Sequence, residues 1–181
     1  IDFIQIPTSL LAQVDSSVGG KTAIDLPMGK NLVGTFYQPD LVLIDPMVLN
    51  TLATRHLVEG YAEIVKMALL AGGEFWQLVT TIDCQSALLA QRQALITQSI
   101  AFKAKVVMAD EQEQGQRRIL NLGHTIGHAV EALAAGQLMH GEAISIGLVA
   151  ILSIFEKQGL SPQGLSKQLR QLLQAVNLPI T

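Results

Sequence analysis

Residues 141–157 read GEAISIGLVAILSIFEK, and this stretch decides the expected fold. Its apolar side chains occupy all faces of a helix instead of one stripe, which indicates a helix that is buried on all sides. The apolar run within it, residues 143–155, is shorter than the ~20 residues that a bilayer-spanning helix needs. We therefore expect a central helix around which other helices pack, and no membrane partner.

Helical patterns fill most of the chain around this stretch. Apolar residues recur at helical spacing in four further segments: residues 55–79 (interrupted at Gly72–Gly73), 85–109, 123–134 and 165–176. Residues 85–109 are predicted as one long helix. Residues 51–181 are therefore expected to form an all-helical domain.

The first 50 residues carry a different pattern. FIQIP (3–7) and LVLID (41–45) are short β-branched runs next to Pro or Asp, which is typical of strands. Between these runs we expect one short helix and two short strands: Leu10–Val14, then Thr22–Ile24 and Asn31–Val33. The fold class is therefore an α/β remnant at residues 1–50 followed by the all-α domain at residues 51–181. Because the chain opens in mid-strand, we expect it to be a piece of a longer protein.

The composition excludes several classes of partner and compartment. The chain has 181 residues, of which 49% are hydrophobic and 15% charged, so it has enough apolar residues for one large core. The net charge of -3 and the aromatic content of 4% argue against a nucleic-acid partner. Cys84 is the single cysteine, so an internal disulfide is excluded and a reducing, cytoplasmic compartment is expected.

Three of the four histidines fall close together in the sequence. His124 and His128 are spaced i, i+4 and share one helix face, and His140 follows across a glycine at the start of the next helix. Imidazole is a common zinc ligand, and a catalytic zinc takes three protein ligands, often including one carboxylate. The alternative is that these histidines are polar caps and surface groups. The clustering favours a metal site, and the spacing alone favours His124 and His128 as its pair.

The best candidate for the carboxylate ligand is Glu63. Glu63 lies among apolar neighbours, and burial of an ionised carboxylate is costly unless a cation or metal pairs with it. The alternative is an exposed Glu63–Lys66 pair of little energetic value. Glu131 and Glu142 compete with Glu63 on spacing.

Polar and cationic residues near these segments indicate an anionic ligand. Lys21 follows Gly19–Gly20, a turn that either cradles phosphate through backbone N–H groups or is a tight hairpin with a solvated lysine. Asp15 either caps this turn or binds a ligand, and Asn121 is either the N-cap of the histidine helix or a ligand contact. Further cations lie on the preceding helix and just before the histidines: Lys103, Lys105, Arg117 and Arg118.

Four sequence segments together resemble the 3-dehydroquinate synthase family of sugar phosphate cyclases. They are PTSLLAQVDSSVGGKTAIDLPMGKNLVGTFYQP, GYAEIVKMALL, FKAKVVMADEQEQGQRRILNLGHTIGHAVE and HGEAISIGL, which span nearly the whole chain in order. The resemblance implies an NAD- and metal-dependent lyase of the shikimate pathway. Such an enzyme converts 3-deoxy-D-arabino-heptulosonate 7-phosphate to 3-dehydroquinate and phosphate, in aromatic amino acid biosynthesis.

The resemblance also implies roles for individual residues. It assigns the divalent metal, zinc or alternatively cobalt, to Glu63, His124 and His140, and places His128 beside the substrate. Substrate and active-site positions would be Lys66, Lys103, Arg117, Asn121, Asp15 and Lys21. NAD contacts would be Thr8, Ser9, Lys21, Lys30, Val48, Leu49, Asn50 and Thr51. The full-length protein would be a homodimer.

Three alternatives remain beside this reading. One is another sugar phosphate cyclase, similar to 2-deoxy-scyllo-inosose synthase, and a second is a metal-dependent polyol dehydrogenase. The third is a non-catalytic helical fragment, which would bind no metal. Because the Gly-rich dinucleotide loop of the family is absent from these residues, we expect the isolated chain to be inactive.

Overall fold

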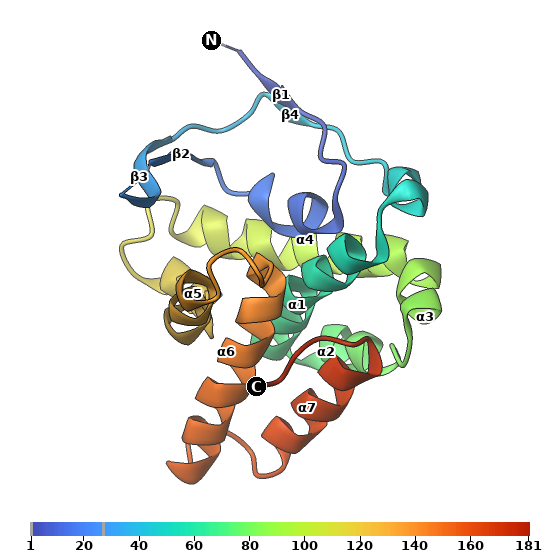
Figure 1. Ribbon diagram of the computed structural model, residues 1–181. Helices are drawn as coiled ribbons and strands as arrows, with labels where there is room; N and C mark the ends of the chain where they lie inside the picture. The colour runs from blue at the N-terminus through green and yellow to red at the C-terminus, as the bar shows by residue number, and fades with distance from the viewer. Residues whose placement is uncertain (1, 27) are drawn as a thin grey trace.

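The computed structural model describes residues 2–26 and 28–181, without the side chains of Asp25, Lys30 and Asn31. A small β part, at the top of Figure 1, lies over a helical body in which α6 runs through the middle of the view. The helices are α1 (Thr54–Ala71), α2 (Gly73–Thr80), α3 (Gln85–Ala90), α4 (Arg92–Ala109), α5 (His124–Leu133), α6 (His140–Lys157) and α7 (Leu165–Ala175). The expected order of an α/β part followed by a helical part is confirmed.

The β part consists of two separate two-stranded sheets. Strand β1 (Ile4–Gln5) pairs in parallel with β4 (Leu41–Val42), and β2 (Lys21–Leu26) pairs antiparallel with β3 (Gly29–Phe36). The β1 and β4 strands are shorter than the predicted runs, whereas the hairpin strands are longer. Between β1 and β2 the expected helical turn begins at Leu10 and continues as the π-helix η1 (Ala12–Ser16).

The core lies around α1. The side chains of α1 are buried without interruption from Leu57 to Ala68, and α1 packs against α2, α4 and α6, while α7 packs on α6. Helix α6 is buried along most of its length, as predicted, but Ile154 near its end is 43% exposed. The apolar pattern therefore identified the central position of α6 but not the exposure of its last turns.

One helix prediction is wrong. Residues 85–109 form two helices, α3 and α4, which are separated at Gln91, where φ is -95° and ψ is 4°. No Gly or Pro marks this break, so the sequence carried no breaker signal. Arg92 donates from Nη1 to the carbonyl oxygen of Leu89 at 2.6 Å, so a side chain contributes to the hydrogen bonding at the end of α3.

Short 3-10 helices complete the chain: η2 (Pro46–Thr51) precedes α1, and η3 (Gln116–Asn121) precedes α5. Asp45 caps η2 by accepting a hydrogen bond from the backbone N–H of Met47 at 2.8 Å. Across the described residues, no helix combines the length and hydropathy that crossing a bilayer requires.

Candidate metal centre and anion site

Three helices bring one carboxylate and two imidazoles together. Glu63 comes from the middle of α1, and His124 and His140 are the first residues of α5 and α6. Glu63 Oε1 lies 3.6 Å from His124 Nε2 and 3.3 Å from His140 Nε2. Ligand atoms held roughly 2.1 Å from a tetrahedral zinc lie about 3.4 Å from one another. The separations therefore fit a shared divalent metal.

His128 belongs to the same cluster. Its ring centroid lies 5.1 Å from that of His124 and 5.7 Å from that of His140, and the ligand atoms of the three histidines all lie within 4.8 Å of one another. Burial separates the four groups, because Glu63 is fully buried and His124 and His140 are mostly buried, whereas His128 is exposed. His128 also lines a separate cavity of about 740 Å³ with Gly29 and Glu131.

Glycines allow the helices of the cluster to approach. A Cβ atom at Gly141 would lie 1.9 Å from the carbonyl oxygen of Glu59, and one at Gly147 would lie 2.1 Å from that of Gly123. Any side chain at these positions would push α6 away from α1 or from the start of α5. Since Gly141 follows His140 directly, and Gly123 precedes His124, these close contacts place the two histidines relative to Glu63.

The electrostatics of the cluster depend on burial and on Lys66. The Glu63–Lys66 pair is buried, so Glu63 lies among apolar neighbours as expected and the alternative of an exposed pair is excluded. Burial acts to raise the pKa of Glu63, but the Lys66 ammonium and the neighbouring histidines outweigh it and hold the pKa well below its usual range. Glu63 is therefore an anion at neutral pH, ready to accept a cation.

The two histidines respond to their surroundings in opposite directions. Burial lowers the pKa of His124 to about 4, so its ring is neutral near pH 7, the form that binds metals. Burial also acts to lower the pKa of His140, but the carboxylates of Glu63 and Glu131 outweigh it and raise the pKa.

The competing carboxylates occupy other positions. Glu142 forms a bidentate pair with Arg55, with both N–O distances at 2.7 Å, and accepts from the backbone N–H of Met139 at 2.9 Å. Glu131 lies on the far side of the His140 ring, with its Oε2 3.4 Å from Nδ1. Glu63 faces the Nε2 atoms of both His124 and His140.

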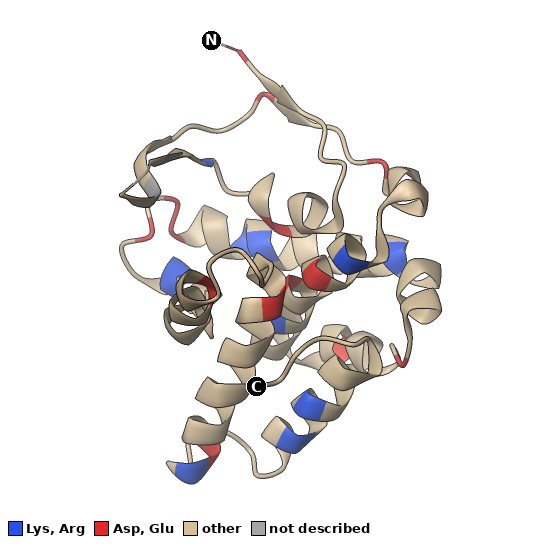
Figure 2. Cartoon of the chain, viewed as in Figure 1, with Lys and Arg blue, Asp and Glu red and all other residues tan. Residues whose placement is uncertain are grey.

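Four predicted site residues line one cavity of about 660 Å³ between the hairpin and α4: Asp15, Lys21, Lys103 and Arg117. Lys103 Nζ contacts Asp15 Oδ1 at 2.7 Å. Arg117 is 2% exposed and donates from Nη2 to the carbonyl oxygen of Gly19 at 2.7 Å. Figure 2 shows charged residues of both signs on the inner helices below the hairpin. Three cationic side chains therefore line this cavity together with one carboxylate, that of Asp15.

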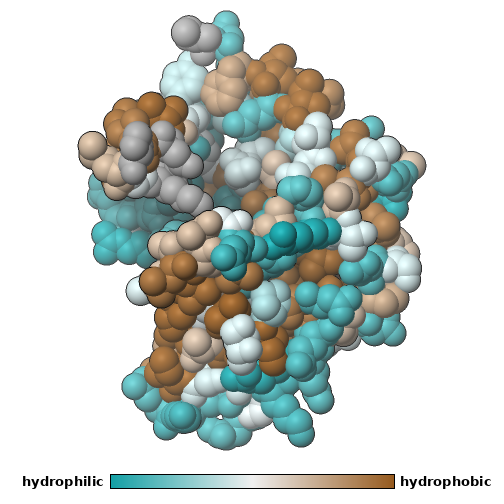
Figure 3. Space-filling view, viewed as in Figure 1, coloured by the Kyte–Doolittle hydropathy of each residue, from teal (hydrophilic) through white to brown (hydrophobic). Residues whose placement is uncertain are grey.

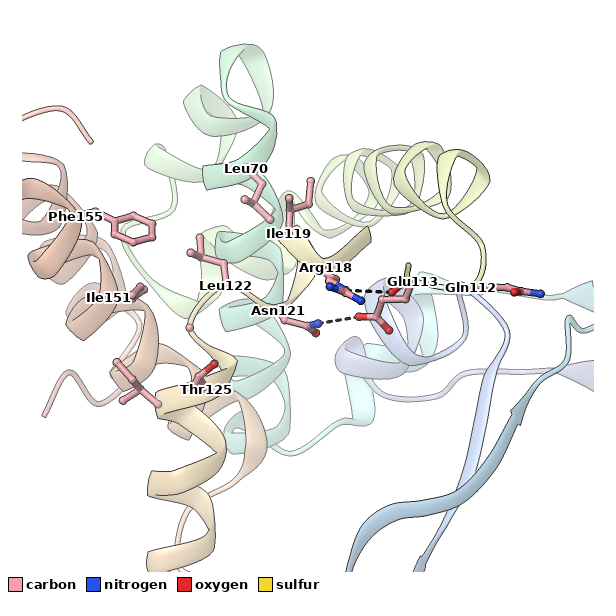
Figure 4. Close-up of a pocket in the computed structure, with 12 residues that line it drawn as sticks. Leu70, Gln112, Glu113, Arg118, Ile119, Asn121, Leu122, Thr125, Ile151 and Phe155 are labelled. Atoms are coloured by element: carbon pink, nitrogen blue, oxygen red, sulfur yellow. Dashed lines mark hydrogen bonds between the residues drawn. The ribbon is translucent and has the colours of Figure 1, made fainter. Parts of the chain in front are cut away.

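Asn121 lies at the end of η3 and lines a neighbouring cavity of about 720 Å³, shown in Figure 4. Its Nδ2 donates to Glu113 Oε1 at 2.7 Å, and Glu113 also forms an ion pair with Lys21. The N-cap of α5 is Gly123, so the alternative of Asn121 as this cap is wrong. Sequence reasoning missed Glu113, because no pattern marks a loop glutamate whose φ is 57°.

The predicted NAD contacts follow two neighbouring strands. Thr8 and Ser9 come after β1, and Val48–Thr51 come after β4. Because the two strands are parallel, both segments follow the carboxyl ends of the strands at the same end of the sheet. Gln13, which is buried, donates from Nε2 to the carbonyl oxygens of Pro7 at 3.2 Å and Asp45 at 2.9 Å and thereby joins the two segments. Dinucleotides commonly bind at the carboxyl ends of parallel strands.

Two of these positions need separate comment. The side chain of Leu49 is 1% exposed and lies in the core, so any ligand contact there has to come from its backbone. The side chain of Lys30 lies outside the part of the chain that the structure describes.

Comparison with protein families matches the chain over its whole length. A family described as "3-dehydroquinate synthase C-terminal" matches residues 60–181, and one described as "3-dehydroquinate synthase N-terminal" matches residues 1–59. The 3-dehydroquinate synthase of Latilactobacillus sakei is 64% identical over 100% of this chain and 50% of its own length. That of Lactiplantibacillus plantarum is 65% identical over 99% of this chain. The chain spans about half the length of the curated relatives it matches.

Two solved structures share this fold. The 2-epi-5-epi-valiolone synthase ValA of Streptomyces hygroscopicus, with NAD+ and Zn2+ bound, superposes with a TM-score of 0.87 at 28% identity, over 99% of this chain and 51% of that one. A 2-deoxy-scyllo-inosose synthase in complex with carbaglucose-6-phosphate, NAD+ and Co2+ superposes with a TM-score of 0.89 at 32% identity, over 98% and 49%. Together with the two family matches, these similarities show that the chain belongs to the 3-dehydroquinate synthase family.

Proposed function

We propose that these residues form the metal- and substrate-binding half of an active 3-dehydroquinate synthase. The whole enzyme would convert 3-deoxy-D-arabino-heptulosonate 7-phosphate to 3-dehydroquinate and phosphate. The observation that carries this proposal is the convergence of Glu63, His124 and His140, whose facing atoms are separated as the ligands of one shared metal would be. The identity of 64% to a 3-dehydroquinate synthase across the whole chain favours this substrate over that of the inosose synthase, which is 32% identical.

Glu63, His124 and His140 would hold the metal. Two nitrogens and one carboxylate oxygen are a donor set that zinc and cobalt both accept. When bound, the metal would lower the pKa of substrate hydroxyl groups and would polarise carbonyl groups. The buried Lys66 beside Glu63 would keep this carboxylate ionised and would offer its remaining N–H groups to the substrate.

The cations around the 660 Å³ cavity would bind the two anionic groups of the substrate. Arg117 and Lys103 are largely buried, so charge-assisted hydrogen bonds to a carboxylate or phosphate would be strong there. Asp15, Lys21 and Asn121 would orient hydroxyl groups. His128 is exposed beside the metal ligands, so its ring could hold and release a proton next to the departing phosphate.

The segments after β1 and β4 would contribute to an NAD site. Thr8, Ser9, Lys21, Lys30 and Val48–Thr51 would contact the cofactor, which accepts a hydride and returns it when bound. Residues 1–50 would then belong to a cofactor-binding domain and residues 51–181 to a metal- and substrate-binding domain. The whole protein would work as a cytoplasmic homodimer.

Metal analysis combined with turnover tests the proposal. In the 181-residue chain, His140→Ala is expected to abolish stoichiometric zinc binding, whereas His128→Ala is expected to retain it. In the whole protein that includes these residues, His128→Ala is expected to keep the metal and lose most of the turnover. Equal metal loss in both variants would contradict the assigned ligand set. Absence of zinc or cobalt from the unmodified chain would contradict the metal centre itself.

Assays of the whole protein with different substrates test the proposed reaction. The whole protein is expected to release phosphate from the heptulosonate phosphate without net NADH, while the isolated 181-residue chain is expected to show no turnover. Net NADH formation would favour a polyol dehydrogenase, and phosphate release from a hexose 6-phosphate would favour the inosose synthase reaction.

A further inference from the structure

We propose that Glu131 is a positioning residue that orients the ring of His140 toward the metal centre. This inference rests on the proposed metal site. An imidazole has two ring nitrogens, and which of them is free to bind a metal depends on the hydrogen bond that the other makes. Both nitrogens of His140 face a carboxylate, so the two partners together decide how the ring is used.

The geometry places the two carboxylates on opposite sides of this ring. Glu131 Oε2 lies 3.4 Å from Nδ1, and Glu63 Oε1 lies 3.3 Å from Nε2. The Glu131 side chain is 13% exposed and that of His140 is 27% exposed, so little water competes for this contact. If Nδ1–H donates a hydrogen bond to Glu131, the lone pair of Nε2 is directed to the side where Glu63 lies.

His124 shows the same arrangement with a different partner. Its Nδ1 lies 3.2 Å from the carbonyl oxygen of Leu122, and its Nε2 faces Glu63. Leu122 is only two residues away, so the local backbone sets the orientation of His124. The ring of His140 turns its Nδ1 to a side chain of the preceding helix instead. Both proposed ligands therefore present Nε2 to one carboxylate and Nδ1 to an oxygen acceptor.

The remaining carboxylate at the start of α6 does not take part in this contact. Glu142 binds Arg55, which also donates from Nη2 to the carbonyl oxygen of Gln137 at 2.7 Å. This pair holds the backbone that leads into α6, whereas Glu131 acts on the ring itself. The sequence offered Glu131 and Glu142 as rival ligands; their contacts divide them into a ring support and a backbone support.

The experiment compares zinc affinity in the 181-residue chain, using competition with a chromophoric chelator. Removal of a carboxylate that supports a metal-binding histidine typically lowers metal affinity 10–100-fold. We expect a loss in this range for Glu131→Ala and a smaller loss for Glu131→Gln, which keeps one acceptor oxygen. Glu74→Gln removes the same charge from an exposed position in α2 and is expected to leave the affinity unchanged.

A second measurement separates orientation from stability. In the metal-free chain, at a pH above the titration of the rings, ¹⁵N spectra report which nitrogen carries the proton. Glu131→Ala is expected to reduce the Nδ1–H form of His140 and to leave His124 unchanged. If Glu131→Ala changes neither the zinc affinity by more than about twofold nor the His140 ring spectrum, the positioning role is wrong. If the ring spectrum changes but the unmodified chain binds no zinc, the proposed metal function fails while the orientation by Glu131 stands.

Discussion

The helical part and the first 50 residues differ in how they bury their apolar side chains. In α1 and α6, long runs of side chains are completely buried, and these helices carry Glu63 and His140. In the β part, apolar side chains of both sheets are exposed: Ile4 60%, Ile6 64%, Ile24 59%, Leu32 57%, Leu41 50% and Leu43 56%. Figure 3 shows this apolar surface over β1 and β4 and over the hairpin.

This difference indicates which part of the chain stabilises the proposed metal centre. Parallel sheets are usually covered on both faces, and two-stranded sheets contribute little stability by themselves. The proposed metal ligands lie on helices that share one core, so they are held whether or not the β part is well packed. The anion cavity spans both parts and therefore depends on the hairpin as well as on α4.

The largest effect is expected from the buried ion pair. Glu63→Ala leaves the ammonium of Lys66 buried without its partner, and such a change costs about 3–5 kcal/mol of unfolding free energy. Denaturant unfolding of the metal-free chain measures this. The double variant Glu63→Leu with Lys66→Met replaces the pair by apolar groups and is expected to regain most of the loss. A loss below about 1 kcal/mol for Glu63→Ala would show that water reaches Lys66.

A matched pair of isoleucines tests the comparison directly. Ile144 in α6 is 0% exposed, and Ile24 in β2 is 59% exposed. Truncation of a fully buried isoleucine to alanine costs about 2–5 kcal/mol, whereas exposed positions change stability by about 0.5 kcal/mol or less. We expect Ile144→Ala to fall in the first range and Ile24→Ala in the second. Equal losses would mean that the hairpin contributes to the same core.

A change of pH is expected to have a smaller effect on the unfolding free energy. The pKa of His124 falls from 6.5 to about 4 in the folded chain, so the unfolded state binds more protons between these values. The unfolding free energy of the metal-free chain should therefore decrease as the pH falls from 6.5 to 4.5, by up to about 2 kcal/mol. His140 acts in the other direction and in another window, because its raised pKa gives stability that is lost as the pH rises above it.

The control for this prediction is His124→Gln, measured with a chelator present. This variant is expected to lose the decrease between pH 6.5 and 4.5, since the group that takes up the proton on unfolding is absent. An unchanged pH profile in the variant would assign the dependence to other groups.

Much of the fold could be predicted because it depends on local patterns. Gly72–Gly73 divides α1 from α2 as predicted, since both glycines adopt positive φ angles. The break between α3 and α4 could not be predicted, because neither Gln91 nor its neighbours carry a Gly or Pro breaker signal.

The candidate site was predictable to a similar extent. Helical spacing placed His124 and His128 on one face, and the structure does bring them into one cluster with His140. Spacing could not show that Glu113 pairs with Lys21 across the chain, because that contact depends on a loop conformation.

The sequence by itself determined the family, the helical character of residues 51–181 and the set of groups available for a metal centre. Local periodicity and the chemistry of the side chains are sufficient for those conclusions. Only the tertiary structure decided which atoms face one another. Glu63, His124 and His140 lie on three different helices, and their separations depend on how closely α6 packs against α1 and α5. The same packing assigned Glu142 to Arg55 and Glu131 to the His140 ring, which no spacing rule could distinguish.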